Sequence, residues 1–297
     1  MNKKNILVYI SLLLASLFWG LSFIWVKDVL IVLNPITLVT IRLIISSCFL
    51  LIVAKLINKL QKIQKGDFSK FILLATAEPL LYYLGETYGL KYVSSTLASV
   101  IISTIPLFVP IAAYYILKVK ISTFNIIGLI VSMFGVLLII FSNSFSLTAS
   151  PKGILLISFA VLSAVAYTLI VKGLSDKYNS ITIVTYQSFF GLLGFLPLFF
   201  IFDFSVFVTL KIDNSVLIPI LCLAILPSSL SYILFTYGIK NLGVNKSSIF
   251  TYAIPVFTAT FAYYFLGEEF TARKITGIII VIIGLTISQI NSLRIRS

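Results

Sequence analysis

The chain has 297 residues, of which 60% are hydrophobic and 10% charged, and it carries a formal net charge of +13 without any histidine. A water-soluble protein of this size needs more polar residues than this to cover its surface. The composition therefore indicates a protein that lies in a lipid bilayer. Without histidine, serine–histidine hydrolysis and zinc chemistry lose their usual residues, and the sequence has no phosphate-binding Gly-Lys-Ser/Thr loop. We therefore expect a protein that is not an enzyme, holds no metal and no cofactor, and draws any energy from a gradient.

Apolar runs follow one another along the chain, with mostly short breaks between them. A helix needs about 20 apolar residues to cross a bilayer, so each run of this length predicts a membrane helix. The expected spans are 7–27, 34–57, 70–91, 95–117, 122–142, 153–174, 181–202, 215–239, 245–266 and 273–291. The sequence thus predicts an all-α integral membrane protein with ten transmembrane helices and no soluble domain.

Basic residues are spread unevenly over the breaks between these runs. About 15 lysines and arginines fall on the side that holds the N-terminus, and about six fall on the other side. Because positive charge marks the cytoplasmic side, we expect both termini in the cytoplasm and a multi-pass protein of the plasma membrane. The same placement accounts for the net charge, so no nucleic-acid partner is expected.

One membrane passage occurs twice. Thr87-Tyr88-Gly89-Leu90-Lys91 returns 149 positions later as Thr236-Tyr237-Gly238-Ile239-Lys240, and Ile105-Pro106 returns as Ile254-Pro255. Five spans per copy is an odd number, so the copies should cross the bilayer in opposite directions, as inverted repeats. The basic loop Lys118-Val119-Lys120 against Gly267-Glu268-Glu269 agrees with this inversion. The expected division is a first repeat over 1–142, a linker over 143–152, a second repeat over 153–291 and a cytoplasmic tail over 292–297.

Among the charged residues, only Arg42, Glu78 and Glu86 lie well inside predicted spans. A charge in hydrocarbon costs at least about 2.5 to 3.5 kcal/mol, so these side chains should face a water-filled cavity or one another. At about 1.5 Å per residue, Arg42 lies about 12 Å and Glu86 about 8 Å from the outer end of the helix, so the two could form a structural ion pair or bind substrate. Glu78 lies about 20 Å deep without a cation. It is either a proton-coupling group or a neutral acid that accepts a hydrogen bond from Tyr82, one helical turn on.

Hydroxyl and aromatic side chains are the further candidates for a cavity lining. The hydroxyl candidates are Ser99, Ser103, Ser231, Ser248 and Tyr252, and the spans of four of them are interrupted by Pro106 or Pro255. Proline frees a backbone carbonyl, which a cavity-lining helix tolerates. The aromatic candidates are Trp19, Phe23, Tyr82, Tyr83, Tyr167, Tyr186, Tyr232 and Tyr252. The alternatives are ordinary: hydroxyls bond their own helix backbone, and aromatic rings anchor helix ends at the membrane interface.

Glycines recur seven residues apart as Gly128 and Gly135 and again as Gly277 and Gly284. Each pair lies on one helix face and suits close contact with another helix. That contact belongs either within the bundle or to a homodimer.

Several motifs resemble one family in their order along both halves. They are Trp19-Gly20-x-x-Phe23, Pro35 with Arg42, Gly89-Leu90-Lys91-Tyr92 before the run to Pro106, and Gly238-Ile239-Lys240 leading through Pro255 to Leu266-Gly267-Glu268 and Gly277. The chain resembles the EamA branch of the drug/metabolite transporter superfamily over almost its whole length. The resemblance implies two inverted five-helix repeats, a central cavity lined mainly by the first, third, fourth, sixth, eighth and ninth helices, and alternating access. Lys118-Val119-Lys120 departs from the Gly-Glu that many members carry there, which counts against a functional role for Glu268.

The leading interpretation is a secondary active or facilitative transporter that exports an amino acid or similar small metabolite, with protons as a candidate coupling ion. The candidate binding and coupling residues are Glu78, Glu86, Arg42, Trp19, Tyr82, Ser99, Ser103, Tyr167, Ser231, Ser248 and Tyr252. The alternatives are efflux of drugs or toxic compounds by the same fold, a channel or lipid scramblase, and an integral-membrane lipid enzyme. The enzyme is disfavoured because Asp28, Asp176, Asp203 and Asp213 are scattered singly along the chain.

Overall fold

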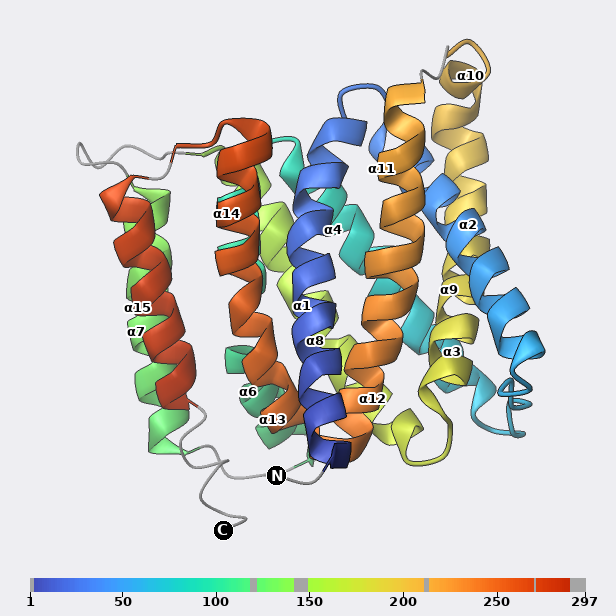
Figure 1. Cartoon of the computed structure of the whole chain (residues 1–297), viewed down its shortest axis with the longest axis horizontal. Helices are drawn as coiled ribbons and strands as arrows, with labels where there is room; N and C mark the ends of the chain where they lie inside the picture. The colour runs from blue at the N-terminus through green and yellow to red at the C-terminus, as the bar shows by residue number, and fades with distance from the viewer. Residues whose placement is uncertain (1–2, 118–121, 142–148, 211–213, 270, 289–297) are drawn as a thin grey trace.

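A computed structural model of the chain describes residues 3–117, 122–141, 149–210, 214–269 and 271–288. These residues form a bundle of helices packed side by side (Figure 1). The loop 118–120, most of the expected linker and the tail 292–297 lie outside the described residues.

The first half of the chain, up to residue 141, contributes seven α-helices and one widened helical turn to the described structure. They are α1 (Lys3–Val29), α2 (Pro35–Leu56), α3 (Phe68–Ala75), η1 (Thr76–Leu81), α4 (Tyr82–Leu90), α5 (Ser95–Ile102), α6 (Ile105–Leu117) and α7 (Thr123–Ile140). The widened turn η1 joins α3 to α4, so Phe68–Leu90 forms one interrupted helix.

The second half repeats this pattern of long and interrupted helices. Its described elements are α8 (Pro151–Ser175), α9 (Ser180–Leu198), η2 (Phe199–Asp203), α10 (Phe204–Phe207), α11 (Asn214–Ile225), η3 (Leu226–Ser231), α12 (Tyr232–Leu242), α13 (Val244–Ser248), η4 (Ile249–Ala253), α14 (Ile254–Leu266) and α15 (Ala272–Ser288). The helix α1 begins and α15 ends at the same end of the bundle, which we call the proximal end (Figure 1).

Within the described residues, eight helical segments are long and apolar enough to cross a bilayer. They are Ile6–Val29, Pro35–Leu56, Ser95–Ala112, Thr123–Ile140, Pro151–Ser175, Ser180–Phe207, Val216–Leu242 and Lys246–Leu266. Eight of the ten predicted spans coincide with these segments. The other two fall on α3–η1–α4, which carries two glutamates, and on α15, whose helix has 17 residues.

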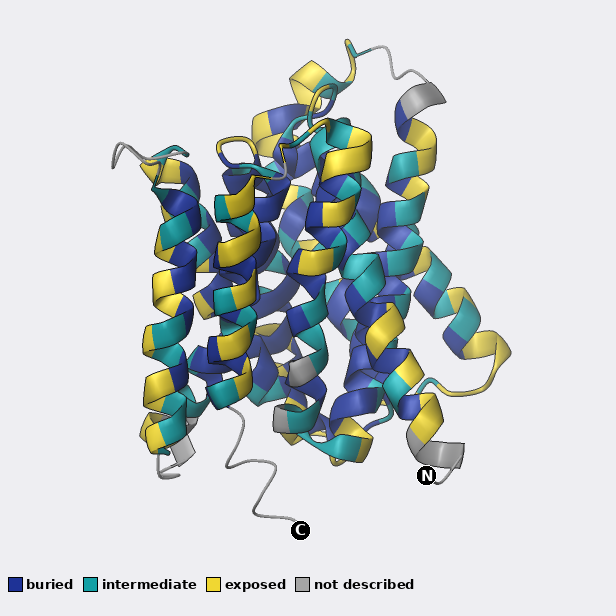
Figure 2. Cartoon of the chain, turned by 60° about the vertical axis from the view of Figure 1, so that its left-hand side comes forward, coloured by how far each residue is buried: buried dark blue, intermediate teal, exposed yellow. Residues whose placement is uncertain are grey.

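The outer surface of the bundle is apolar, as lipid requires. Figure 2 shows exposed positions along the outer faces of the helices and buried ones toward the interior. Large exposed side chains include Leu155 (70%), Ile218 (70%) and Phe265 (69%). Polar residues such as Arg42, Ser46 and Ser229 are buried instead, at 2%, 0% and 0% exposure. This inverted arrangement is that of a multi-pass membrane protein.

The helix backbone widens at matching places in the two halves. Both η1 and η3 are π-helical turns, and they contain Pro79 and Pro227. Proline has no N–H to donate, so it leaves backbone carbonyls without their usual partner. In η3, the hydroxyls of Ser228 and Ser229 donate to the carbonyls of Leu223 and Ala224, each over 2.7 Å. Side chains thus replace backbone hydrogen bonds in the interior of the bundle.

The recurring glycines bring α7 and α15 together. The two helices lie side by side (Figure 1), and a Cβ atom added to Gly135 would lie 2.8 Å from the carbonyl oxygen of Gly277. One added to Gly284 would lie 2.5 Å from the backbone nitrogen of Ser132. The glycine pairs therefore serve contact within the chain, and they do not supply a free face for a dimer.

At the proximal end, the connection between α2 and α3 is fastened to the turn between α8 and α9. The side chain of Gln61 accepts from Asn179 N over 2.6 Å, and Gln64 N donates to the hydroxyl of Tyr178 over 2.9 Å. The carboxylate of Asp67, 3% exposed, accepts from Lys70 (2.7 Å), Lys177 (3.0 Å) and Tyr178 (3.2 Å). Lys70 first, and then Lys177, hold the pKa of Asp67 down at about 2.

Candidate functional site: a central cavity between the two halves

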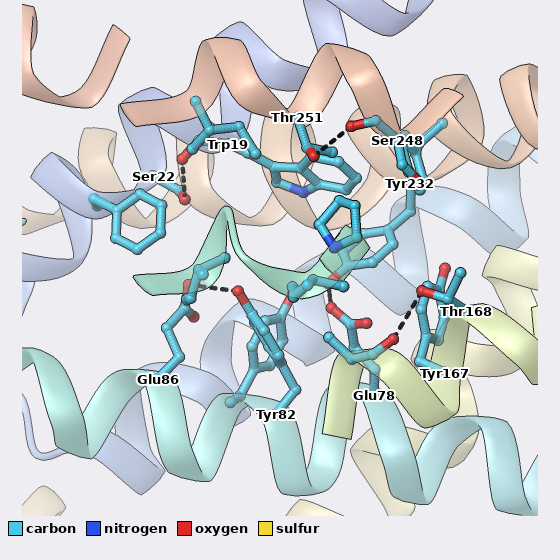
Figure 3. Close-up of a pocket in the computed structure, with 18 of the residues that line it drawn as sticks. Trp19, Ser22, Glu78, Tyr82, Glu86, Tyr167, Thr168, Tyr232, Ser248 and Thr251 are labelled. Atoms are coloured by element: carbon cyan, nitrogen blue, oxygen red, sulfur yellow. Dashed lines mark hydrogen bonds between the residues drawn. The ribbon is translucent and has the colours of Figure 1, made fainter. Parts of the chain in front are cut away.

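A cavity lies in the interior of the bundle, lined by residues that are far apart in the sequence. Residues from both halves form its wall (Figure 3). The lining residues are Trp19, Ser22, Phe23, Arg42, Glu78, Tyr82, Tyr83, Glu86, Ile102, Ile105, Pro106, Ala164, Tyr167, Thr168, Tyr232, Phe235, Ser248, Thr251 and Ile254. All three charges predicted to lie inside the membrane are among them.

Arg42, on α2, is held by a serine and a tyrosine. Its Nε donates to the hydroxyl of Ser228, and its guanidinium carbon lies 4.2 Å from the centre of the Tyr83 ring. Stacking on a ring suits the planar, weakly hydrated guanidinium. Of the two alternatives for Arg42 and Glu86, the structural ion pair is not formed, because no nitrogen–oxygen distance within 4.0 Å joins Arg42 to a carboxylate among the described residues. Its Nη1 atom is buried without a hydrogen-bond partner.

Glu86 lies on α4 and is 4% exposed. Its Oε1 accepts from the hydroxyl of Tyr82, one helical turn earlier, over 3.3 Å, and its Oε2 is buried without a partner. Figure 3 shows Tyr82 beside Glu86 on the same helix. The carboxylate of Glu86, which lines the cavity, is thus anchored through one oxygen only.

Glu78 lies in η1, where its backbone leaves the helical conformation (φ −147°, ψ 118°). Its carboxylate accepts a hydrogen bond from the hydroxyl of Tyr232 in the second half (Figure 3). The alternative in which Tyr82 donates to Glu78 is therefore wrong in its partner, since Tyr82 donates to Glu86 and Tyr232 donates to Glu78. A phenol can donate to a charged carboxylate and to the carbonyl oxygen of a neutral carboxyl group, so the contact with Tyr232 is compatible with either form of Glu78.

The aromatic candidates Trp19, Tyr82 and Tyr167 lie in the cavity wall. Trp19 meets Phe235 edge-on at 5.0 Å and Tyr232 at 5.5 Å between ring centres, and Tyr167 meets Tyr232 at 5.9 Å. Such edge-to-face contacts make a rigid apolar wall. These rings are part of the bundle interior and not interfacial anchors.

Of the hydroxyl candidates, only Ser248 lines the cavity, and Pro106 lines it while Pro255 does not. Ser99 and Ser103 donate to carbonyls of their own helix, those of Thr96 (2.8 Å) and Val100 (2.7 Å). Ser231 and Tyr252 are buried elsewhere. Ser231 donates to Ala15 over 3.2 Å, and Tyr252 donates to Leu285 over 3.2 Å.

The polar lining residues Ser22 and Thr168 escaped the sequence analysis, and so did Ser228, which holds Arg42 from outside the lining. Ser228 had a signal, because Pro227-Ser228-Ser229 interrupts the apolar run of the eighth predicted span. Ser22 and Thr168 had none, since each donates to a nearby carbonyl of its own helix, as buried hydroxyls commonly do.

Comparison with known proteins agrees with this architecture. The EamA-like transporter family matches residues 6–141 and again residues 151–289. An uncharacterized transporter of Archaeoglobus fulgidus is 29% identical over 94% of this chain and 97% of its own length. The uncharacterized transporter YetK of Bacillus subtilis is 29% identical over 97% of this chain and 88% of its own.

More distant similarities extend this agreement. The WAT1-related protein At3g02690, chloroplastic, of Arabidopsis thaliana is 27% identical over 90% of this chain and 66% of its own length. One solved crystal structure shares the fold, with a TM-score of 0.72 at 11% identity over 98% of this chain and 99% of that one. Because the family matches nearly the whole length in two copies, the chain belongs to the EamA-like transporter family.

Proposed function

We propose that this transporter moves an amino acid or similar small metabolite out of the cell, across the plasma membrane, by alternating access to the central cavity. The observation that carries the proposal is the convergence of Arg42, Glu78 and Glu86 on one cavity whose wall comes from both halves. Buried ionisable groups inside a membrane mark substrate and ion pathways, because they cost too much to be retained without a role.

The proposed architecture is ten membrane helices in two inverted repeats, 1–142 and 153–291, joined by 143–152 and followed by a tail over 292–297. Two family matches, over 6–141 and 151–289, support this division. The recurrence of a widened turn with a proline in η1 and η3 supports it as well. With an odd number of helices in each repeat, α1 would begin and α15 would end on the same side, which the basic loops assign to the cytoplasm.

Glu78 is the proposed proton-coupling group. It is 5% exposed, lines the cavity, and is hydrogen-bonded by a tyrosine of the opposite half. A proton taken up by Glu78 would change the charge of the cavity and the strength of its contact with Tyr232. Proton binding would then be linked to the way the two halves meet.

Transport by purified protein in proteoliposomes tests the proposal. Solute counterflow with labelled amino acids measures movement without a gradient, and an imposed pH gradient measures coupling. Glu78→Gln should keep counterflow and lose the pH-driven component, while the matched control Glu269→Gln, at an exposed position, should keep both. Unaltered gradient-driven uptake by Glu78→Gln would remove the role of Glu78, and the absence of counterflow for every solute would contradict the proposed transport.

A further inference from the structure

Two oppositely charged side chains that line the cavity each have one polar atom with a hydrogen-bond partner and one buried polar atom without a partner. Arg42 is bonded through Nε to Ser228, and Glu86 is bonded through Oε1 to Tyr82. The remaining atoms, Nη1 of Arg42 and Oε2 of Glu86, are buried and have no partner. Both residues line the same cavity and are 2% and 4% exposed.

These two atoms do not satisfy each other. No ion pair within 4.0 Å joins the two side chains, and each is held in place by its own anchor. A buried charge with an unpaired atom is costly, so such an arrangement is maintained where something else completes it. The fixed anchors also reduce the entropy that a ligand would lose on ordering the site.

We propose that Arg42 and Glu86 form a clamp for a small zwitterion, with an anionic group of the substrate on Nη1 of Arg42 and an ammonium group on Oε2 of Glu86. A carboxylate fits the guanidinium fork, and an ammonium group fits a single carboxylate oxygen. This inference rests on the proposed transport function and names the chemical class of its substrate. Substrate binding and proton coupling then use different carboxylates. Glu86 binds the ammonium group, and Glu78, which accepts from Tyr232, remains available for the proton.

The rest of the cavity suits the body of such a molecule. Trp19, Phe23 and Phe235 supply an apolar wall. Hydroxyl groups of Ser22, Ser248 and Thr251 are occupied by carbonyls of their own segments, at 2.7 to 2.8 Å. Charge recognition of the substrate therefore falls to Arg42 and Glu86, and the uncharged lining groups add shape.

Binding of matched ligand triads to the full chain in detergent tests the clamp. Each triad contains an amino acid, the amine that lacks its carboxylate, and the acid that lacks its ammonium group. The probes are phenylalanine with phenethylamine and 3-phenylpropanoate, leucine with 3-methylbutylamine and 4-methylpentanoate, and serine with ethanolamine and 3-hydroxypropanoate. For at least one triad, the amino acid should bind about tenfold or more tightly than both analogues, because each analogue leaves one buried charge unpaired.

Two variants give a crossed pattern that a purely structural role would not produce. Glu86→Gln should lose the preference for the amino acid over the acid analogue, and Arg42→Gln should lose the preference over the amine. Glu269→Gln and Lys152→Gln, at exposed positions, are the charge-matched controls and should bind as the unmodified chain does. If a variant does not fold, the triads on the unmodified chain decide alone.

Equal binding of zwitterion and analogues, or no binding of any of the three amino acids, would overturn the clamp. Counterflow separates this failure from that of the proposed function. Transport of singly charged or neutral solutes without preference for a zwitterion would leave the transporter in place and contradict the clamp alone.

Discussion

The hydroxyl of Tyr232 donates a hydrogen bond to the carboxylate of Glu78 and so links η1 of the first half to the start of α12 in the second. Both residues are almost fully buried, at 4% and 5% exposure. The contact therefore joins a candidate coupling group in one half to a side chain of the other. A change at Glu78 would be transmitted directly between the halves.

Replacing Tyr232 by phenylalanine removes this donor and leaves a buried carboxyl group without its partner. We expect Tyr232→Phe to lower the free energy of unfolding by about 1 to 3 kcal/mol and to slow pH-driven transport more than counterflow. Thermal unfolding in detergent and the two transport assays measure these effects. Tyr92→Phe is the control, because Tyr92 is 39% exposed and its hydroxyl accepts from the exposed Lys152. Equal stability of the two variants would show that the Glu78 contact contributes nothing.

Gly191 on α9 lies against Pro79 in η1, and a Cβ atom there would come within 2.7 Å of Pro79 Cδ. We expect Gly191→Ala to displace η1, to destabilise the protein by about 1 to 3 kcal/mol and to reduce transport, because a packed interior does not accept an added methyl group. Gly173→Ala on α8 is the matched control, since nothing lies within 4 Å of a Cβ atom at that site. A Gly191→Ala variant as stable and as active as Gly173→Ala would contradict the close packing around η1.

The bonds of Asp67 at the proximal end predict a distinct pH dependence. Because its pKa is lowered from 3.8 to about 2, the folded state binds its proton less readily than the unfolded state. The stabilisation that the Asp67 carboxylate contributes to the folded state is therefore fully present above about pH 4 to 5 and is lost as the pH falls through 2. The difference in melting temperature between the unmodified protein and Asp67→Asn should be constant from pH 5 to 8 and should shrink below pH 4.

Asp176→Asn is the control for Asp67, because Asp176 is 67% exposed in its pair with Lys172. Exposed ion pairs contribute little to stability, so its melting temperature should stay close to that of the unmodified protein. A stabilisation by Asp67 that varied strongly between pH 6 and 8 would contradict its assignment to the lysine pairs.

That the three charged residues inside the spans line a cavity could be predicted from the sequence, because a charge is too costly in hydrocarbon to face lipid. That argument predicts that Arg42, Glu78 and Glu86 face a cavity or one another, and the structure places all three in the lining of one cavity. The partners could not be predicted. Tyr82 lies four residues from both Glu78 and Glu86, and helix spacing alone favours neither. The non-helical backbone at Glu78 decides between them, and Tyr232 is remote in sequence.

The hydroxyl candidates failed for a local reason. Ser99 and Ser103 look suited to a polar cavity, but a carbonyl three residues earlier is always within reach of a helical serine.

Glu268 makes a contact that the sequence did not predict. The sequence treats it as a loop residue, whereas its carboxylate accepts from the backbone nitrogen of Ser95 over 2.7 Å and caps the start of α5. A cap from a segment so distant in the chain leaves no local pattern.

Thiol labelling at Ser248 tests the central claim, a cavity reached in turn from each face of the membrane, most directly. Ser248 lines the cavity, and the two native thiols, Cys48 and Cys222, are first replaced by serine. Ser248→Cys should react with a membrane-impermeant thiol reagent in both right-side-out and inside-out vesicles, and Ser99→Cys, buried outside the cavity lining, should react in neither. Reaction of Ser248→Cys from one face only, or from neither, would contradict alternating access.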